Sequence, residues 1–258
     1  MMKNLKYILL VGLIVMSFYL TDKVMIYLEN KNPLMQEIKA KAAFYQTNAA
    51  NAKVKGNTII PGLNGKKVSL RKSYGKMWEF GAFNETFLAF DEIKPEITAR
   101  DHLDKEIIKG NPLKRAVSLL LAPNNKVESF LNDSEIQYTL IAKINADLTK
   151  KCEYLNGEAS LEKASDLNAL LNQKKLNKNL CLVGYSNLAF CQAKKYYLVA
   201  PSVDTSTNIT SLLTKIQSGD IILIKESITL DNLNLILKEI QRQDLKIVYL
   251  STLISESN

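Results

Sequence analysis

Few side chains in this sequence belong to the types that usually act as nucleophiles or bind transition metals. There is one histidine, His102, and there are three cysteines, Cys152, Cys181 and Cys191. A cysteine nucleophile needs a histidine or an equivalent base nearby, and a zinc site needs about three or more protein donors. His102 stands in the charged segment ARDHLDKE, which is typical of a solvated surface, and the four positions match no zinc spacing template. The sequence therefore favours neither Cys–His catalysis nor a structural metal.

The pairing of the cysteines stays open at the level of sequence. Because their number is odd, they cannot form a fully paired intramolecular set. Cys181 and Cys191 would form a disulfide if the fold brought them together. Their neighbours Leu180, Leu182 and Phe190 are apolar, however, and suit buried free thiols equally well.

Polar side chains that directly follow predicted strands form a second group of candidates. In β/α proteins the binding sites lie at the carboxyl ends of the strands. We therefore expect a shared rim that contacts a sugar or an anionic group, and its candidate members are Asn124, Asn125, Asp204, Lys225 and Glu226. The alternative for each of them is a solvated loop residue.

The elements that would position this rim follow from the hydrophobic pattern after residue 110. Short apolar runs, several of them continuously apolar, predict strands that are buried on both faces. These runs are 116–121, 138–142, 180–183, 196–200, 221–224 and 247–250, with a weaker one around 152–154. Apolar stripes at helical spacing predict helices around 127–131, 161–171, 209–216 and 233–240, the last one capped by Asp231. Strands that alternate with helices indicate a mainly parallel sheet, either an open sheet or a closed barrel.

The N-terminus has the pattern of an export signal. Lys3 and Lys6 precede the uncharged apolar run Tyr7–Leu20. That run is short for a membrane span of about 20 residues, but it can extend into Val24–Leu28 if the charged side chains between them snorkel. No small-x-small cleavage site follows, so we expect an uncleaved, single-pass anchor with the domain outside the cell membrane. A cleaved signal peptide or a buried core helix are the alternatives.

These patterns predict four segments. Residues 1–28 form the signal anchor, which contacts the membrane through residues 7–28. Residues 29–56 form a stalk or linker helix, solvated around its apolar positions. Residues 57–109 form a small accessory unit with turn signals at PG and NG, and residues 110–258 form the main domain.

Three stretches of the sequence resemble the NodB-like polysaccharide deacetylases of carbohydrate esterase family 4. They are GNTIIPGLNGKKVSLRKSYGKMWEFGAFNE, GNPLKRAVSLLLAPNN, and the closing pattern SGDIILIKE…LNLILKEIQRQDLKIVYLSTLISE. The resemblance extends over roughly 57–255. It implies a distorted (β/α)7-type barrel. It also implies an activity: active members remove acetyl groups from N-acetylglucosamine polymers with a divalent metal held by Asp and His side chains.

The sequence departs from that family pattern at the metal-binding positions. The two Asp positions after the first strand fall on Ala122 and Pro123, and the late His position falls on Lys225. No His-x-x-x-His motif is present, and the Arg-Pro-Pro motif retains only Pro201. The nearby amides of Asn124 and its neighbour are weak zinc ligands and poor bases. We therefore expect a domain of this type without catalytic or metal-binding residues and without a cofactor.

Charge and composition narrow the class of partner. The chain has 34 basic and 26 acidic residues, but only four of the basic residues are arginines, and the lysines are scattered. Nucleic-acid-binding proteins usually concentrate their basic residues and use Arg for base contacts. We therefore expect no nucleic-acid partner, and instead a Lys-rich surface attracted to anionic envelope polymers.

Three hypotheses for function result. The first is a non-catalytic module that binds cell-wall polysaccharide or peptidoglycan, or an unidentified protein partner, through the rim. The second is an active carbohydrate deacetylase with an unconventional site. The third is a purely structural scaffold.

Overall fold

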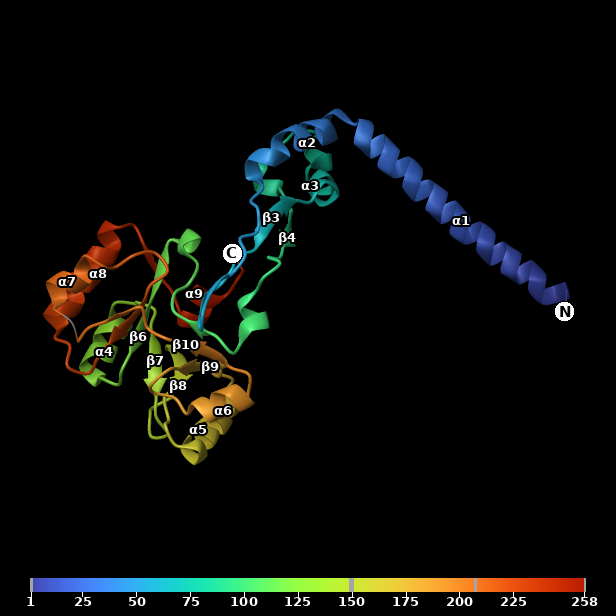
Figure 1. Ribbon diagram of the computed structural model, residues 1–258. Helices are drawn as coiled ribbons and strands as arrows, with labels where there is room; N and C mark the ends of the chain where they lie inside the picture. Colours follow the sequence, from blue (N-terminus) through green and yellow to red (C-terminus); the bar gives the residue numbers. More distant parts are fainter. Residues whose placement is uncertain (1, 149–150, 207, 258) are drawn as a thin grey trace. The chain divides into compact units, whose positions relative to one another are not determined.

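The computed structural model describes residues 2–148, 151–206 and 208–257. Contacts divide the chain into two compact units (Figure 1). The N-terminal unit comprises Met1–Asn48 and Gly65–Ile93, and the half-barrel unit comprises Ala49–Asn64 and Lys94–Asn258.

Helices dominate the N-terminal unit. Its elements are α1 (Met2–Lys31), α2 (Pro33–Tyr45), β3 (Gly65–Val68), α3 (Leu70–Met77), the 3₁₀ turns η1 (Trp78–Phe80) and η2 (Glu85–Phe87), and β4 (Phe90–Ile93). Strands β3 and β4 form an antiparallel pair.

Helix α1 contains the apolar segment that the sequence suggested. Its part from Val11 to Lys31 is long and apolar enough to cross a membrane. The side chains along residues 11–25 are exposed, which distinguishes this helix from a buried core helix. An apolar helix at the N-terminus is either a signal sequence or an anchor, and it suggests a secreted or membrane protein.

Helix α2 is not the solvated connecting helix that we expected within residues 29–56. Asn32 caps it, because its side chain accepts a hydrogen bond from the Leu34 amide at 2.9 Å, and Pro33 occupies the first turn. Its apolar stripe packs into a small core instead of facing water. The buried members of that core are Leu34, Met35, Ile38, Ala42, Val68, Tyr74, Met77 and Leu88.

Strands and helices alternate through most of the half-barrel unit. Its strands are β1 (Lys53–Lys55), β2 (Thr58–Ile60), β5 (Glu106–Ile107), β6 (Ala116–Leu121), β7 (Thr139–Ala142), β8 (Glu153–Asn156), β9 (Leu180–Leu182), β10 (Tyr197–Val199), β11 (Val203–Asp204), β12 (Ile221–Ile224) and β13 (Lys246–Ile247). Its helices are α4 (Asn125–Asp133), α5 (Leu161–Gln173), α6 (Leu188–Ala193), α7 (Ile209–Leu213), α8 (Leu230–Arg242) and α9 (Leu250–Ile254), with the 3₁₀ turns η3 (Ala99–His102) and η4 (Pro112–Lys114).

The strands form one curled, mixed half-barrel sheet. Their order is β1-β2-β5-β10-β9-β8-β7-β6-β12-β11, and β13 also pairs with β6. Among the described strands of this sheet, β1 and β2 pair antiparallel and the other neighbours pair parallel. This confirms the expected α/β fold with a mainly parallel sheet.

The observed units differ from the expected segments. Strands β2 and β5 lie inside residues 57–109, the range expected to form a separate accessory unit. They pair with each other and β5 pairs with β10, so they extend the main sheet. Both strands are too short for their apolar residues to be recognised without the sheet that they join.

Two apolar layers cover the faces of the sheet. Along β6, Val117, Leu119 and Leu121 belong to the core that also contains residues of α4, α5, α7 and α8. The alternate residues Ala116 and Leu120 belong to a second core, which includes residues of α9. Because strand side chains alternate between faces, α4, α5, α7 and α8 cover one face and α9 covers the other.

The start of α8 corrects one detail of the sequence prediction. Thr229, and not Asp231, caps the helix, since its hydroxyl accepts a hydrogen bond from the Asn232 amide at 3.3 Å. Asp231 lies in the first turn, where its negative charge interacts favourably with the helix dipole.

A buried carboxylate attaches α9 to the sheet. Glu153 of β8 is 5% exposed, and it accepts hydrogen bonds from the Ser251 amide at 3.0 Å and from the Thr139 hydroxyl at 3.2 Å. The Ser251 hydroxyl also donates to it. Burial raises the pKa of Glu153 above its ordinary value of 4.5, although these hydrogen bonds oppose the shift.

The direction of this shift predicts a pH dependence. A carboxyl group whose pKa is raised on folding stabilises the fold fully below its unfolded pKa, and the contribution is lost as the pH rises through the folded pKa. The stability advantage of the natural chain over Glu153→Gln should therefore narrow as the pH rises above the ordinary carboxyl pKa of 4.5. Urea unfolding of the full chain in detergent, followed by circular dichroism, measures it.

Glu153→Ala should be costlier than Glu153→Gln, by about 1–3 kcal/mol, because it leaves the Ser251 amide without this acceptor. Exposed Glu162→Gln serves as the matched control and should be neutral. Equal losses for both Glu153 variants, with no dependence on pH, would contradict this account of the α9 attachment.

Candidate functional site

The candidate residues Asn124 and Glu226 meet at the carboxyl ends of β6 and β12. The side chain of Asn124 accepts hydrogen bonds from the amides of Lys126 and Val127, both at 3.2 Å, and so caps α4. Its amide group donates to the backbone oxygen of Glu226 at 2.8 Å. Asn125 begins α4 and is exposed, as is Glu226.

Asp204 and Lys225 form an ion pair beside them. The Lys225 Nζ lies 3.2 Å from the Asp204 Oδ2, and each side chain is about a third exposed, at 35% and 34%. Burial acts to raise the pKa of Asp204, but hydrogen bonds from Ser206 and Lys225 outweigh it and hold that pKa below its ordinary value. Because β6 pairs with β12 and β12 with β11, the fold brings together the strand ends that carry the sequence candidates.

A cavity of about 280 Å³ opens next to these residues. It lies where the chain continues from β11 and β12, and hydroxyl and amide side chains outnumber the apolar ones around it. The residues that line it are Thr205, Asn208, Ile209, Ser227, Ile228 and Asn232. We call it the rim cavity; its lining is mostly polar and carries no charged side chain, which suits neutral hydroxyl groups. None of these residues was predicted from the sequence as part of a site, because isolated Ser, Thr and Asn side chains carry no distinctive signal.

The ends of β7, β8 and β9 carry a buried polar network that the sequence analysis also missed. Glu158 is 7% exposed, and its carboxylate accepts a hydrogen bond from the Ile144 amide at 2.8 Å. Its backbone oxygen accepts from the Asn187 amide at 2.9 Å. Asn156 donates to the Ala164 oxygen at 2.8 Å and accepts from the Glu158 amide at 3.1 Å. These groups join neighbouring loops to one another.

The donor set does not fit a deacetylase metal. Ala122 and Pro123 directly follow β6, and Lys225 directly follows β12. Neither alanine nor proline side chains have a metal donor, and the Lys225 ammonium is paired with a carboxylate. Among the described residues, no group of three or more His, Cys, Asp and Glu side chains could hold a metal ion. We derive no metal-dependent step for this chain.

The three cysteines and the histidine lie on different segments of the chain. Cys181 of β9 and Cys191 of α6 form a disulfide, with a Cα–Cα distance of 6.2 Å. The thiol of Cys152 is free and buried, and burial raises its pKa, which opposes formation of a nucleophilic thiolate. His102 ends the turn η3, before β5.

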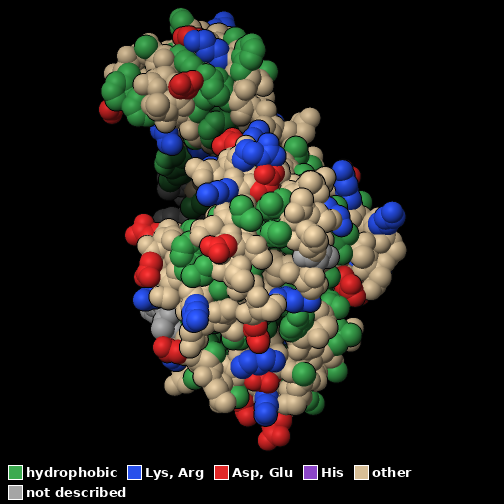
Figure 2. Space-filling model, turned by 90° about the vertical axis from the view of Figure 1, so that its left-hand side faces the viewer, with side chains coloured by type: hydrophobic (Ala, Val, Ile, Leu, Met, Phe, Trp, Pro, Cys, Tyr) green, Lys and Arg blue, Asp and Glu red, His purple; other side chains and the backbone are tan. Residues whose placement is uncertain are grey.

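Charge is mixed on the face of the molecule that Figure 2 presents. Lys and Arg side chains are interspersed there with Asp and Glu, and no continuous basic surface forms on this face of the described chain. A nucleic-acid-binding face would show a concentrated basic patch.

Comparison with solved structures identifies the architecture. The wild-type BA3943 protein of Bacillus anthracis, a CE4 family pseudoenzyme, superposes with a TM-score of 0.64 at 19% identity, covering 87% of this chain and 96% of that one. A BA3943 mutant with restored enzymatic activity gives 0.62 at 20% identity, covering 87% and 99%. The chain has the fold of a CE4 polysaccharide deacetylase.

Sequence comparison adds a partial relative. The YlxY protein of Bacillus subtilis (strain 168) is 38% identical over 93 residues, which are 36% of this chain and 29% of that protein. The match thus spans less than a third of the relative. No protein-family model matches the chain.

The disulfide can be checked by counting thiols. Without reductant, alkylation of the unfolded, exported chain should attach one label, because one of the three cysteines is free. After reduction it should attach three. Cys152→Ala should accept no label before reduction. Three labels on the unreduced natural chain, read by intact mass, would show that Cys181 and Cys191 are thiols.

Proposed function

We propose that this chain is a non-catalytic, membrane-anchored protein of the cell exterior that binds a cell-wall glycan through its strand-end rim. The observation that carries the proposal is the composition of that rim. The positions at which the family resemblance implies metal ligands hold Ala122, Pro123 and Lys225. Hydrogen-bonding groups remain beside them, however, in the rim cavity.

The chemistry of the rim cavity supports a neutral carbohydrate as the ligand. Sugars offer many hydroxyl groups, which pair with the amides and hydroxyls of Asn and Ser side chains. The adjacent Asp204–Lys225 ion pair satisfies both charges internally, so it does not by itself attract an ionic ligand. Active proteins of the family that the sequence resembles act on N-acetylglucosamine polymers, which makes this the glycan class to test first.

Two features support a location outside the cell membrane. The apolar part of α1 has the length of a membrane span. The Cys181–Cys191 disulfide belongs to an oxidising compartment, since the cytosol keeps most thiols reduced. Together they favour a single-pass anchor with the half-barrel unit outside.

Glycan binding can be tested with one pair of variants on α8. Asn232 lines the rim cavity, whereas Asn234 does not. Asn232→Leu removes hydrogen-bonding groups each worth about 0.5–1.5 kcal/mol. It should therefore weaken binding of an N-acetylglucosamine oligomer about tenfold, which corresponds to about 1.4 kcal/mol. Asn234→Leu is the matched control and should bind normally. Calorimetry on the full chain in detergent gives both affinities. Equal affinities would show that the rim cavity is not the glycan-binding site.

The absence of deacetylation is a separate prediction. With Zn²⁺, Co²⁺ or Ni²⁺ added, the full chain should release no acetate from acetylated N-acetylglucosamine oligomers. The reason is that no group of three or more His, Cys, Asp and Glu side chains among the described residues could hold the metal. The BA3943 mutant with restored enzymatic activity is a suitable positive control with the same fold. Acetate release that a chelator abolishes and a metal restores would establish an active enzyme instead.

A further inference from the structure

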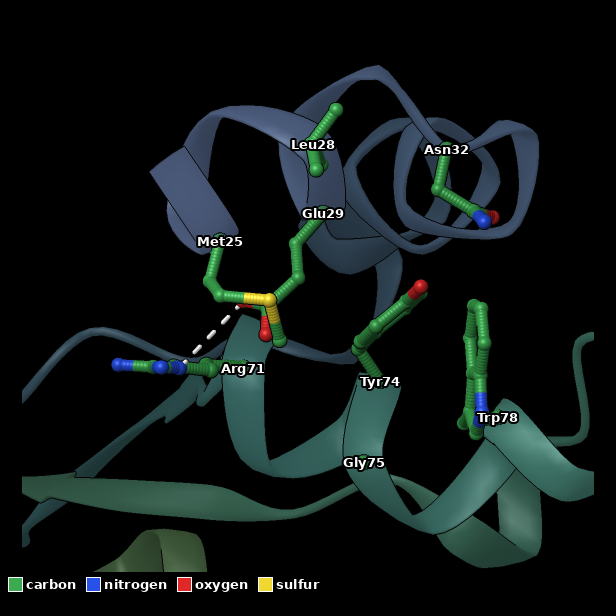
Figure 3. A pocket seen from close by; sticks show the side chains of 8 residues that line it. All are labelled: Met25, Leu28, Glu29, Asn32, Arg71, Tyr74, Gly75 and Trp78. Atoms are coloured by element: carbon green, nitrogen blue, oxygen red, sulfur yellow. Dashed lines mark ion pairs between the residues drawn. The ribbon is translucent and has the colours of Figure 1, made fainter. Parts of the chain in front are cut away.

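A second, larger cavity lies in the N-terminal unit. It has a volume of about 590 Å³ and lies between the last turns of α1 and helix α3 (Figure 3). The side chains around it are Met25, Leu28, Glu29, Asn32, Arg71, Tyr74, Gly75 and Trp78. We call it the α1–α3 cavity.

The wall of this cavity is mainly apolar, and its charges are paired within the protein. Arg71 Nη2 lies 3.1 Å from the Asp22 carboxylate, and Arg71 Nε lies 3.4 Å from the Glu29 carboxylate. One guanidinium therefore faces two carboxylates, which leaves no excess positive charge for an anionic ligand. Met25, Leu28 and Trp78 supply apolar surface, so the cavity suits a hydrocarbon occupant.

Large aromatic side chains around this unit are exposed. Trp78 is 57% exposed, Phe80 is 63% exposed and Phe44 is 85% exposed. On the exposed helix α1, Lys31 Nζ lies 4.6 Å from the centre of the Tyr27 ring. Tryptophan and tyrosine side chains are enriched at the interface between membrane and water, and lysine side chains near helix ends extend toward it.

The position of the cavity along α1 relates it to a bilayer. The uncharged apolar run of this helix begins at Tyr7. A membrane span of about 20 residues that begins there ends near Tyr27. Met25 then lies near the outer end of the span, where the acyl chains join the head groups.

We infer that the α1–α3 cavity holds the head-group end of an acyl chain of a membrane lipid and that Trp78 lies at the membrane interface. The inference rests on the anchoring part of the proposed function. The occupant follows from continuity: the cavity wall is the same helix that would be surrounded by lipid. Helix α3 would then lie at the bilayer surface and hold the N-terminal unit there.

The sequence provides its own probe, because Trp78 is the only tryptophan in the chain. The full chain is reconstituted into phosphatidylglycerol–phosphatidylethanolamine vesicles whose lipids carry bromine either near the head-group end or near the methyl end of the acyl chain. Bromine near the head group should quench Trp78 fluorescence more strongly than bromine near the methyl end. Acrylamide in the water should quench it weakly.

Gly75→Leu tests the cavity itself. A Cβ atom at Gly75 meets nothing within 4 Å, so this position has open space, and a leucine there takes space from the occupant. Quenching by bromine near the head group should be weaker in this variant than in the natural chain. The matched control is Lys76→Leu, which adds the same side chain to the next residue of α3, outside the cavity lining. It should keep the quenching.

Extraction of the vesicles at alkaline pH separates the possible failures. If the chain stays in the membrane but acrylamide alone quenches Trp78, the inference is wrong and the anchor stands. If neither agent quenches it, a second copy or another protein covers the cavity, which also overturns the inference. If the chain leaves the membrane, both the inference and the anchoring proposal fail, while glycan binding has its own assay.

Discussion

The need to cover both faces of a curled, apolar sheet is the constraint on which the half-barrel unit depends. Val117 and Leu119 of β6 enter the core shared with the outer helices, and Leu120 enters the core shared with α9. Strands buried on both faces stay stable only if apolar layers cover each side. The closing helix α9 is therefore part of the sheet's core, and the carboxylate of Glu153 fixes its first turn. The apolar residues Leu250, Leu253 and Ile254 near the end of the sequence are the ones that α9 packs against the sheet.

This constraint separates the fold from the chemistry of the rim. The apolar alternation inside the strands places no demand on the residues that follow them, such as Ala122, Pro123 and Lys225. At the ends of β7 and β8, Glu158 and Asn156 bond to neighbouring loops, so polar groups there support the architecture. A chain can thus keep a deacetylase fold after its metal donors have been replaced, and the similarity in fold to a pseudoenzyme agrees with this.

The sequence predicted most of the half-barrel because its signals there are local. Continuous apolar runs located the central strands, and helical stripes located α5 and α8. The misses required knowledge of partners distant in sequence. The stripe of α2 looked like a solvated stalk until Val68 and Met77 were placed against it, and the Cys181–Cys191 disulfide depended on how β9 and α6 pack. At the rim, the predicted strand ends correctly placed Asn124 near Glu226 and Asp204 near Lys225. The cavity beside them could not be predicted, because its shape depends on the conformation of the loops.

In the described part of the chain, the strand ends hold no set of oxygen and imidazole donors able to bind a divalent cation. Anomalous diffraction from crystals of the chain soaked in Zn²⁺ measures this directly. The account predicts no anomalous peak bound by side chains where β6, β11 and β12 end. A strong peak there, held by three or more side chains, would contradict it.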